Sequence, residues 1–369
     1  MRGKRACNPR RRMDVAALKR SQLENVARHR EDLRRKPRLR WLFFEITDRC
    51  NLECAHCGSS CTSGGKALTV SDIEKTLKSI PQEKPAVCLT GGEPMLHPAF
   101  FDIAGLVRNM GFYWGMTTNA TLIDDAAAER LKLAGMSTVS VSIDGMEESH
   151  DRLRRRQGAW KKALHGLQAL QNAGFEPQVT TVLHRENFDE LDRLYVLLRS
   201  MGVRSWRPIN IEPIGRACES GSMFLTHEQY LSLLSYIRGK RFDPDCGMEV
   251  TFGCSHYLGV ENERMVRDHY FLCGAGILTA GVRSNGDICA CLDIENRPEL
   301  VQGNIRTDDL MDVWLKRFQV FRRDRTADCI RCTMCPERFV CGGDSAHTWD
   351  FGRNEPLLCY RDICMRKDA

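Results

Sequence analysis

The chain has 369 residues, of which 42% are apolar, 28% are charged and 18 are cysteines. A chain of this length can bury sizeable cores without disulfides, so the cysteine count does not indicate a small disulfide-stapled protein. The basic N-terminus lacks the apolar segment of a signal peptide, and no run approaches the ~18 apolar residues of a membrane span. We therefore expect a cytoplasmic protein with no membrane partner, in which closely spaced cysteines bind metals or act in catalysis.

The positive charge is concentrated at the N-terminus. Residues 1–40 carry 15 lysines and arginines against four acidic residues, a local charge of +11, which leaves −5 for the rest of the chain. A negatively charged body makes nucleic acid an unlikely partner and leaves the role of the basic arm open. Residues 13–36 are expected to form either a solvated surface helix or a docking arm for an acidic partner. On either interpretation, Val15, Leu18, Val26 and Leu33 are expected on one side of this helix.

From residue 41 onward, short apolar segments alternate with amphipathic segments. This alternation is typical of βα units and predicts an α/β fold with a parallel sheet. Six units fit residues 41–243, which predicts a partial (β/α)6 TIM-like barrel. The expected strands are 41–47, 86–90, 113–118, 137–143, 177–183 and 204–211. The expected helices are 71–80, 98–110, 124–134, 158–173, 187–201 and 226–238.

Local signals mark several helix ends. Ser71 and Glu74 have the spacing of a capping box. Four glycines follow helical segments, where a left-handed residue often ends a helix. They are Gly111, Gly135, Gly174 and Gly202.

The C-terminal third has a different character. Past Asp243 the periodicity gives way to loops rich in glycine, and twelve of the eighteen cysteines follow residue 215. We therefore expect residues 244–369 to form a separate cysteine-rich domain held together by bound metal.

A first cysteine cluster directly follows the first expected strand. Cys50, Cys54 and Cys57 have C-x3-C-x2-C spacing, and three thiolates leave one position of an ordinary zinc or iron–sulfur site open. A zinc site completed by His56 or Cys61 is the alternative. The segment Thr90-Gly91-Gly92-Glu93-Pro94 ends the second strand, at the edge where parallel β/α folds bind ligands. Its glycines let backbone approach a ligand, and its carboxylate suits an amine.

Together these motifs resemble the radical S-adenosylmethionine (SAM) superfamily. Ser142-Ile143-Asp144-Gly145, with His150-Asp151 and Arg154 after it, is similar to the peptide-modifying branch and to anaerobic sulfatase-maturing enzymes. The resemblance implies that the three cysteines hold a [4Fe-4S] cluster whose open iron binds SAM. It also implies SAM contacts from His56, Gly92, Glu93, Asn119, Ser142 and Arg154.

Plainer interpretations of three of these residues stay open. Asn119 suits a simple turn as well as a ribose contact, and Ser142 suits a helix cap. Arg154 lies in a run of charged residues that suits a solvated helix face.

A second set of cysteines lies near the C-terminus. Cys332, Cys335 and Cys341, with Cys359 following, suit a closed iron–sulfur cluster or a zinc ribbon. Upstream, Cys273, Gly286 and Cys291 follow the order C-x12-G-x4-C. The combination resembles the SPASM extension of radical SAM maturases. This resemblance implies an inner auxiliary [4Fe-4S] cluster on Cys273 and Cys291. It also implies an outer auxiliary [4Fe-4S] cluster on Cys332, Cys335, Cys341 and Cys359.

The sequence departs from the SPASM pattern at Ser345, where the pattern has a fourth cysteine. The inner cluster is therefore completed by another residue, keeps an open iron or is absent. The candidate substitutes are Cys254, Cys289 and Cys329. Asp293, two residues after Cys291, is a candidate catalytic base, with an ordinary loop carboxylate as the alternative.

The resemblance implies an enzyme, and we rank peptide maturation first. Such an enzyme uses a 5'-deoxyadenosyl radical to form a C–C, C–O or thioether cross-link in a ribosomal precursor peptide. The alternatives are oxidation of a Cys or Ser to formylglycine, as in sulfatase maturation, and tailoring of a tetrapyrrole or other small molecule. An iron–sulfur redox sensor is the non-enzymatic alternative. Expected partners are the precursor peptide, a separate leader-recognition protein and a flavodoxin- or ferredoxin-type electron donor.

Overall fold

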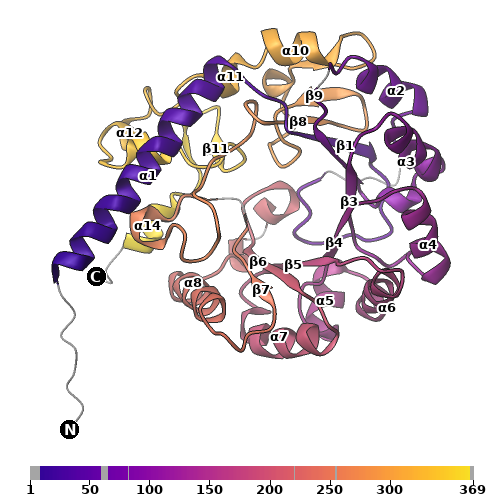
Figure 1. Cartoon of the computed structure of the whole chain (residues 1–369), viewed down its shortest axis with the longest axis horizontal. Coiled ribbons are helices and arrows are strands. Elements are labelled where there is room, and N and C mark those ends of the chain that lie inside the picture. The colour runs from indigo at the N-terminus through magenta and orange to yellow at the C-terminus, as the bar shows by residue number, and fades with distance from the viewer. Residues whose placement is uncertain (1–8, 60–64, 82, 220, 254–255, 366–369) are drawn as a thin grey trace.

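The sheet at the centre of the molecule is built largely from parallel strands. The computed structural model describes residues 9–59, 65–81, 83–219, 221–253 and 256–365. Six parallel strands pair in chain order and curve into an incomplete barrel with helices on the outside (Figure 1). They are β1 (Trp41–Thr47), β2 (Ala86–Gly91), β3 (Trp114–Thr118), β4 (Thr138–Ser142), β5 (Gln178–Leu183) and β6 (Ser205–Asn210). This arrangement confirms the predicted α/β barrel.

The helices that follow these strands cover the outside of the barrel. They are α2 (Val70–Lys78), α3 (Phe100–Asn109), α4 (Asp125–Leu133), α6 (Ala159–Asn172), α7 (Leu191–Ser200) and α8 (His227–Arg241). The four predicted terminal glycines all have φ between 73° and 90°, which confirms their role at helix ends. The predicted capping box was wrong by two residues. Thr69 and Asp72 form it instead, because Thr69 precedes the first helical turn and Asp72 reaches back to its N–H.

A helix inside the barrel region was not predicted. Helix α5 (Glu147–Arg154) fills the connection between β4 and α6, and it buries His150, Leu153 and Arg154. Most of its residues are charged or polar, so no apolar stripe marks this helix in the sequence. The interpretation of Arg154 as part of a solvated face was therefore wrong.

The C-terminal third continues the barrel sheet on both edges. Strand β7 (Glu249–Val250) pairs in parallel with β6, and β8 (Thr279–Val282) pairs in parallel with β1. Antiparallel strands β9 (Asp287–Cys289) and β10 (Gly303–Asn304) extend the same sheet. One core contains residues from both halves, such as Phe44 and Val282. The sheet therefore continues across the domain boundary expected between residues 243 and 244. That this boundary divides a SAM-binding region from an auxiliary-cluster region stays a prediction.

Short elements complete the C-terminal region. The helices are α9 (Gly259–Asn262), α10 (Leu310–Lys316), α11 (Gln319–Arg322), α12 (Ile330–Thr333), α13 (Arg338–Cys341) and α14 (Tyr360–Met365). Strands β11 (Trp349–Asp350) and β12 (Glu355–Pro356) form a separate small sheet. The 3-10 turns are η1 (Pro94–Leu96), η2 (Phe188–Glu190), η3 (Gly215–Glu219), η4 (Gly221–Met223) and η5 (Pro298–Leu300).

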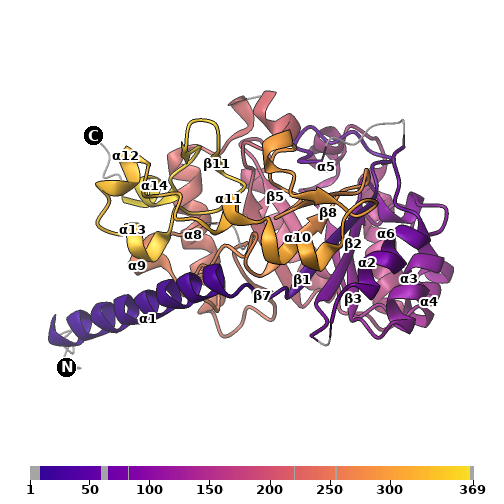
Figure 2. The same ribbon diagram turned by 90° about the horizontal axis from the view of Figure 1, so that it is seen from above.

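The N-terminal arm is a long helix, α1 (Pro9–Arg35), that lies along the C-terminal region (Figure 2). Leu23 is buried against Tyr257, Phe271 and Val340. Arg30 donates to the carbonyl of Val340 at 3.1 Å. The expectation of a solvated helix was therefore wrong for this face, which is formed by Leu23, Ala27, Arg30 and Leu33, whereas Leu18 is exposed.

Candidate functional site

Cys50, Cys54 and Cys57 converge in the loop after β1. Cys54 is buried, and Cys50 and Cys57 are half-buried beside Leu52 and Ala159. Burial, with smaller contributions from the neighbouring Cys54 and Cys57, raises the pKa of Cys50 to about 11. Thiols in this state release their protons only when a cation binds between them. Their convergence and their partial access fit a metal cluster with three thiolate ligands.

The Gly-Gly-Glu segment after β2 is packed against this loop. Gly92 N–H donates to the carbonyl of Thr47 at 2.9 Å, and Glu93 N–H donates to the carbonyl of Arg49 at 2.8 Å. A Cβ atom on Gly92 would lie 2.2 Å from the Arg49 oxygen, and one on Gly91 would lie 2.4 Å from the Thr47 oxygen. Only glycine permits this close approach, so the two glycines fix Glu93 beside the cysteine loop.

Glu93 is buried and held by the loop after β3. Its carboxylate accepts from Thr118 Oγ1 at 2.7 Å and from Asn119 N–H at 2.9 Å. Burial raises the pKa of Glu93 to about 7, against these hydrogen bonds. Asn119 Nδ2 donates to Asn51 Oδ1, and its Oδ1 accepts from Thr121 N–H. Asn119 therefore forms the expected turn, and its predicted ribose contact stays a prediction.

A buried ion pair that the sequence analysis did not single out lies at the end of β4. Asp144 is fully buried and accepts from Arg154 Nε at 2.7 Å and from Val182 N–H at 2.8 Å. His56 Nε2 lies 3.7 Å from the same carboxylate. Burial opposes ionisation, but Arg154 and His56 hold the pKa of Asp144 at about 2. Burial lowers the pKa of His56 to about 4, so its imidazole is neutral.

The six predicted SAM-binding residues lie on the loops at one edge of the barrel or close to it. Ser142 ends β4 and is half-buried. The cap of α5 is Met146, so the alternative in which Ser142 caps a helix was wrong. The residues are His56, Gly92, Glu93, Asn119, Ser142 and Arg154. Asp144 could have been found from the sequence as a carboxylate at the end of a strand, the position where parallel sheets bind ligands.

The outer cysteines line one pocket of about 230 Å³. Four thiols facing a single cavity fit a closed four-thiolate cluster. These are Cys332, Cys335, Cys341 and Cys359. Burial raises the pKa of Cys332 to about 12, and its neighbours Cys329, Cys359 and Cys335 contribute to this rise.

The predicted inner pair lies beside the loop that contains Ser345. Ala346 N–H donates to Cys273 Sγ at 3.4 Å, and Cys291 Sγ contacts Asp293 Oδ2 at 3.7 Å. Burial raises the pKa of Cys291, and nearby Asp293 and Cys273 add to this rise. Ser345 is buried at the position where the pattern has a cysteine. Asp293 is exposed and touches the thiol group, and its role as a base stays a prediction.

The three candidate substitutes have different surroundings. Cys329 lies against Cys332, so it belongs spatially to the outer group and not to the inner one. Cys289 ends β9, is buried, and is an electrostatic neighbour of Cys291. Cys254 lies outside the described residues. Within the described part of the chain, Cys289 is therefore the candidate that the fold brings to the inner pair.

No helix among the described residues is long and apolar enough to cross a membrane.

Two family models match the chain. Residues 44–198 match the radical SAM superfamily, and residues 273–336 match an iron–sulfur cluster-binding domain known as SPASM. The first range contains Cys50, Cys54 and Cys57, and the second contains Cys273 and Cys291.

Similar proteins of two kinds are found among named relatives. An AdoMet-dependent heme synthase of Methanosarcina barkeri is 28% identical over 349 residues, covering 88% of this chain and 97% of the relative. Another from Oleidesulfovibrio alaskensis is 27% identical and covers 91% of each chain. The mycofactocin maturase MftC of Mycolicibacterium smegmatis is 26% identical and covers 82% of this chain and 76% of its own.

A solved structure has a closely similar fold. Streptococcus suis SuiB, bound to S-adenosylmethionine, superposes with a TM-score of 0.72 at 17% identity, covering 89% of this chain and 78% of SuiB. The resemblance at this identity concerns the fold alone. SAM and [4Fe-4S] clusters are the cofactors that the two matched domains use. The chain is therefore an enzyme of the radical SAM superfamily, in the group that carries a C-terminal SPASM domain.

Proposed function

We propose that the enzyme oxidatively modifies a tetrapyrrole that carries carboxylate side chains. The observation that carries this proposal is the similarity to AdoMet-dependent heme synthases, which extends over 97% and 91% of those relatives. The similarity to the maturase MftC extends over 76% of that protein. The sequence analysis ranked peptide maturation first and tetrapyrrole tailoring among the alternatives. Similarity along nearly the whole length of the heme synthases supports the opposite order.

An arginine inside the barrel supports a substrate with carboxylates. Trp206 of β6 packs against Tyr195 and Tyr236 of the surrounding helices, so it points outward. Side chains alternate along a strand, and Arg207 therefore points into the barrel. Burial raises the pKa of Cys88 on β2, and the charge of Arg207 opposes this rise. Since three strands separate β2 from β6 in the sheet, this interaction crosses the barrel interior.

Arg207 has no hydrogen bond or ion pair with another side chain or carbonyl among the residues described, and its Nε is buried. Arg207 is half-buried, so its guanidinium is free to bind an anion that enters the barrel. A carboxylate of the substrate would match the fork of the guanidinium. Arg207 is therefore our candidate for the residue that anchors the substrate.

The other residues have roles that follow from their positions. Cys50, Cys54 and Cys57 would hold the cluster that binds SAM, and the outer four cysteines would hold an auxiliary cluster. When bound, SAM and its cluster supply a carbon radical that removes a hydrogen atom from the substrate. Asp144 holds the Arg154 guanidinium, and Thr118 and Asn119 hold the Glu93 carboxylate, and both side chains would contact SAM. A flavodoxin- or ferredoxin-type protein would supply the reducing electron.

The test is an anaerobic reaction of the cluster-loaded enzyme with SAM, dithionite and iron coproporphyrin III. We expect 5'-deoxyadenosine, which carries one hydrogen atom of the substrate, and a porphyrin product whose mass has fallen by CO2 and two hydrogens per modified side chain. The second hydrogen would leave as the carboxyl proton, and the electron left on the substrate would pass to the auxiliary cluster. Arg207→Gln removes a charged hydrogen bond, which contributes about 1.5–3 kcal/mol, so we expect KM to rise roughly ten- to hundredfold. Arg204→Gln is the matched control, because Arg204 is exposed and pairs with Glu176. If SAM is cleaved but iron coproporphyrin III stays unmodified, this tetrapyrrole is excluded as the substrate.

Peptide maturation is the second candidate, and the similarity to MftC over 82% of this chain favours it. A short peptide encoded beside the gene is the substrate to test. Under the same conditions, a cross-linked or otherwise oxidised peptide together with an unchanged porphyrin would support this candidate instead.

A further inference from the structure

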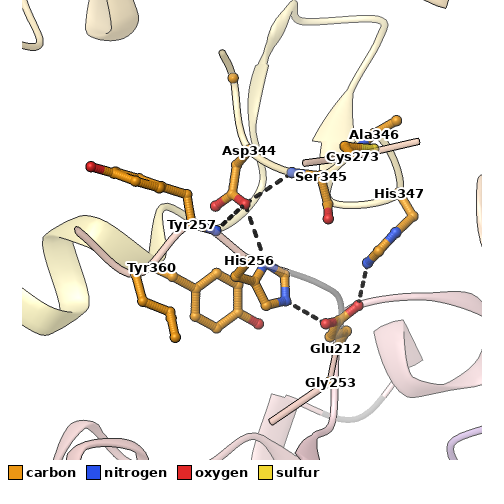
Figure 3. A network of polar contacts seen from close by, with 12 residues as sticks. Glu212, Gly253, His256, Tyr257, Cys273, Asp344, Ser345, Ala346, His347 and Tyr360 are labelled. Carbon is orange, nitrogen blue, oxygen red and sulfur yellow. Dashed lines mark hydrogen bonds and ion pairs between the residues drawn. The ribbon is translucent and has the colours of Figure 1, made fainter. Parts of the chain in front are cut away.

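Two histidines and a glutamate meet between the barrel and the C-terminal region. Glu212 lies two residues beyond the end of β6, His256 lies in the segment between β7 and α9, and His347 lies between α13 and β11. Their ligand atoms all lie within 4.8 Å of one another. Figure 3 shows both imidazoles turned toward the Glu212 carboxylate. Three segments far apart in the sequence are thus folded onto one point.

The carboxylate uses a different oxygen for each histidine. Glu212 Oε1 contacts His256 Nε2, and Glu212 Oε2 lies 2.8 Å from His347 Nε2. The side chain of His256 is fully buried, whereas Glu212 and His347 keep 12% and 10% exposure. A further ligand could therefore approach from the side of Glu212 and His347.

A second carboxylate lies behind His256. Asp344 Oδ1 is 3.5 Å from His256 Nδ1, and it accepts from Tyr257 N–H at 3.0 Å and Ser345 N–H at 2.9 Å. His256 Nδ1 is buried and has no hydrogen bond among the described residues. A histidine that binds a metal through Nε2 carries its proton on Nδ1 and donates it to a carboxylate or carbonyl. Asp344 is placed to receive this proton.

The His256 ring is also fixed by packing. The ring of Tyr360 stacks on it with 3.4 Å between centroids, and Asn210 Nδ2 donates to the Tyr360 hydroxyl at 2.6 Å. A metal site needs ligands that are held in place, and the fixed His256 ring meets this requirement.

We propose that Glu212, His256 and His347 bind one divalent transition-metal ion that is separate from the iron–sulfur clusters. Two imidazoles and one carboxylate suit Fe²⁺ or Zn²⁺, and three protein ligands leave an open position.

The location indicates what the open position faces. The segment that begins with Glu212 continues to Arg216, whose N–H donates to the carbonyl of Cys57 at 3.0 Å and whose Nε donates to that of Cys54 at 2.8 Å. On the other side, His347 lies two residues after Ser345, beside Cys273. The proposed ligands are thus connected through residues 212–216 to the first cysteine loop and through residues 345–347 to Cys273. An oxygen or nitrogen donor of a substrate, such as a carboxylate, would complete the coordination of the metal.

The experiment uses the full chain with its clusters assembled, so that the cluster cysteines are occupied. The protein is incubated anaerobically with Zn²⁺, dialysed, and measured by elemental analysis and zinc K-edge X-ray absorption, which does not detect cluster iron. We expect about one zinc per chain with only nitrogen and oxygen neighbours. Absence of retained zinc, or zinc with sulfur neighbours only, would overturn the proposal.

Variants add a second criterion. Glu212→Gln and His347→Gln are each expected to weaken Zn²⁺ binding at least tenfold, and Asp344→Asn roughly 10- to 100-fold, as for other carboxylates behind ligating histidines. Glu263→Gln is the matched control, because this buried carboxylate pairs with Arg267 and not with a histidine. Equal binding by Glu212→Gln and the unmodified protein would refute the site. If the variants fail to fold, the absorption spectrum of the unmodified protein still decides.

Discussion

The Asp144–Arg154 pair offers the sharpest test of the barrel site. Asp144→Asn keeps the size of the side chain but removes its charge, and it leaves the buried Arg154 guanidinium facing an amide that can also donate. Removing one partner of a buried pair costs about 3–5 kcal/mol. The ratio of unfolded to folded protein should therefore rise between roughly a hundredfold and a few thousandfold.

The assay is urea denaturation of cluster-loaded protein under anaerobic conditions, followed by cluster absorbance and circular dichroism. The double variant Asp144→Asn with Arg154→Met should recover most of the loss, because no unpaired charge is then buried. Asp124→Asn is the matched control, since Asp124 is an exposed N-cap of α4, and asparagine caps a helix as well as aspartate does. A loss below about 1 kcal/mol in Asp144→Asn, or additive losses in the double variant, would refute the reasoning.

Three further changes follow from the packing. Gly92→Ala places a Cβ atom 2.2 Å from the Arg49 oxygen and 2.9 Å from Cys50 Cβ, so the first cluster should be lost from EPR spectra, whereas Gly105→Ala, with open space, should keep it. Leu23→Ala should cost about 2–5 kcal/mol in denaturant titrations, and the exposed Leu18→Ala almost nothing. Cys329→Ser should leave the iron content unchanged at about twelve per chain for three clusters or about eight for two, whereas Cys335→Ser should lower it by about four. Equal iron loss in both variants would contradict the outer ligand set.

The barrel was largely predictable because its signals are local. β1 is a short apolar run and β4 alternates apolar and polar residues, and both patterns are typical of strands. Gly111 or Gly174 ends a helix through a backbone conformation that glycine favours. The cysteine loop and the Gly-Gly-Glu segment were also found, because each motif spans only a few consecutive residues.

The features that the sequence analysis missed depend on residues that are far apart in the chain. The pairing of β8 with β1 joins residues more than 200 positions apart, and two-residue strands such as β7 carry no periodic pattern. The Asp144–Arg154 pair is an exception, because its members are only ten residues apart. It was missed because a charged helix such as α5 normally indicates a solvent-exposed face. Glu212, His256 and His347 show no spacing motif, so only the fold brings them together.

The position of β8 also has a consequence for dissecting the protein. β1 contains the apolar run Trp41-Leu42-Phe43-Phe44, and each of these residues is in register with a residue of β8. A chain cut after residue 243 would leave the backbone donors and acceptors along this side of β1 without partners, on an apolar edge that could template pairing with other molecules. The C-terminal region thus shields the barrel from aggregation, and the isolated barrel should be insoluble even before any cofactor is considered.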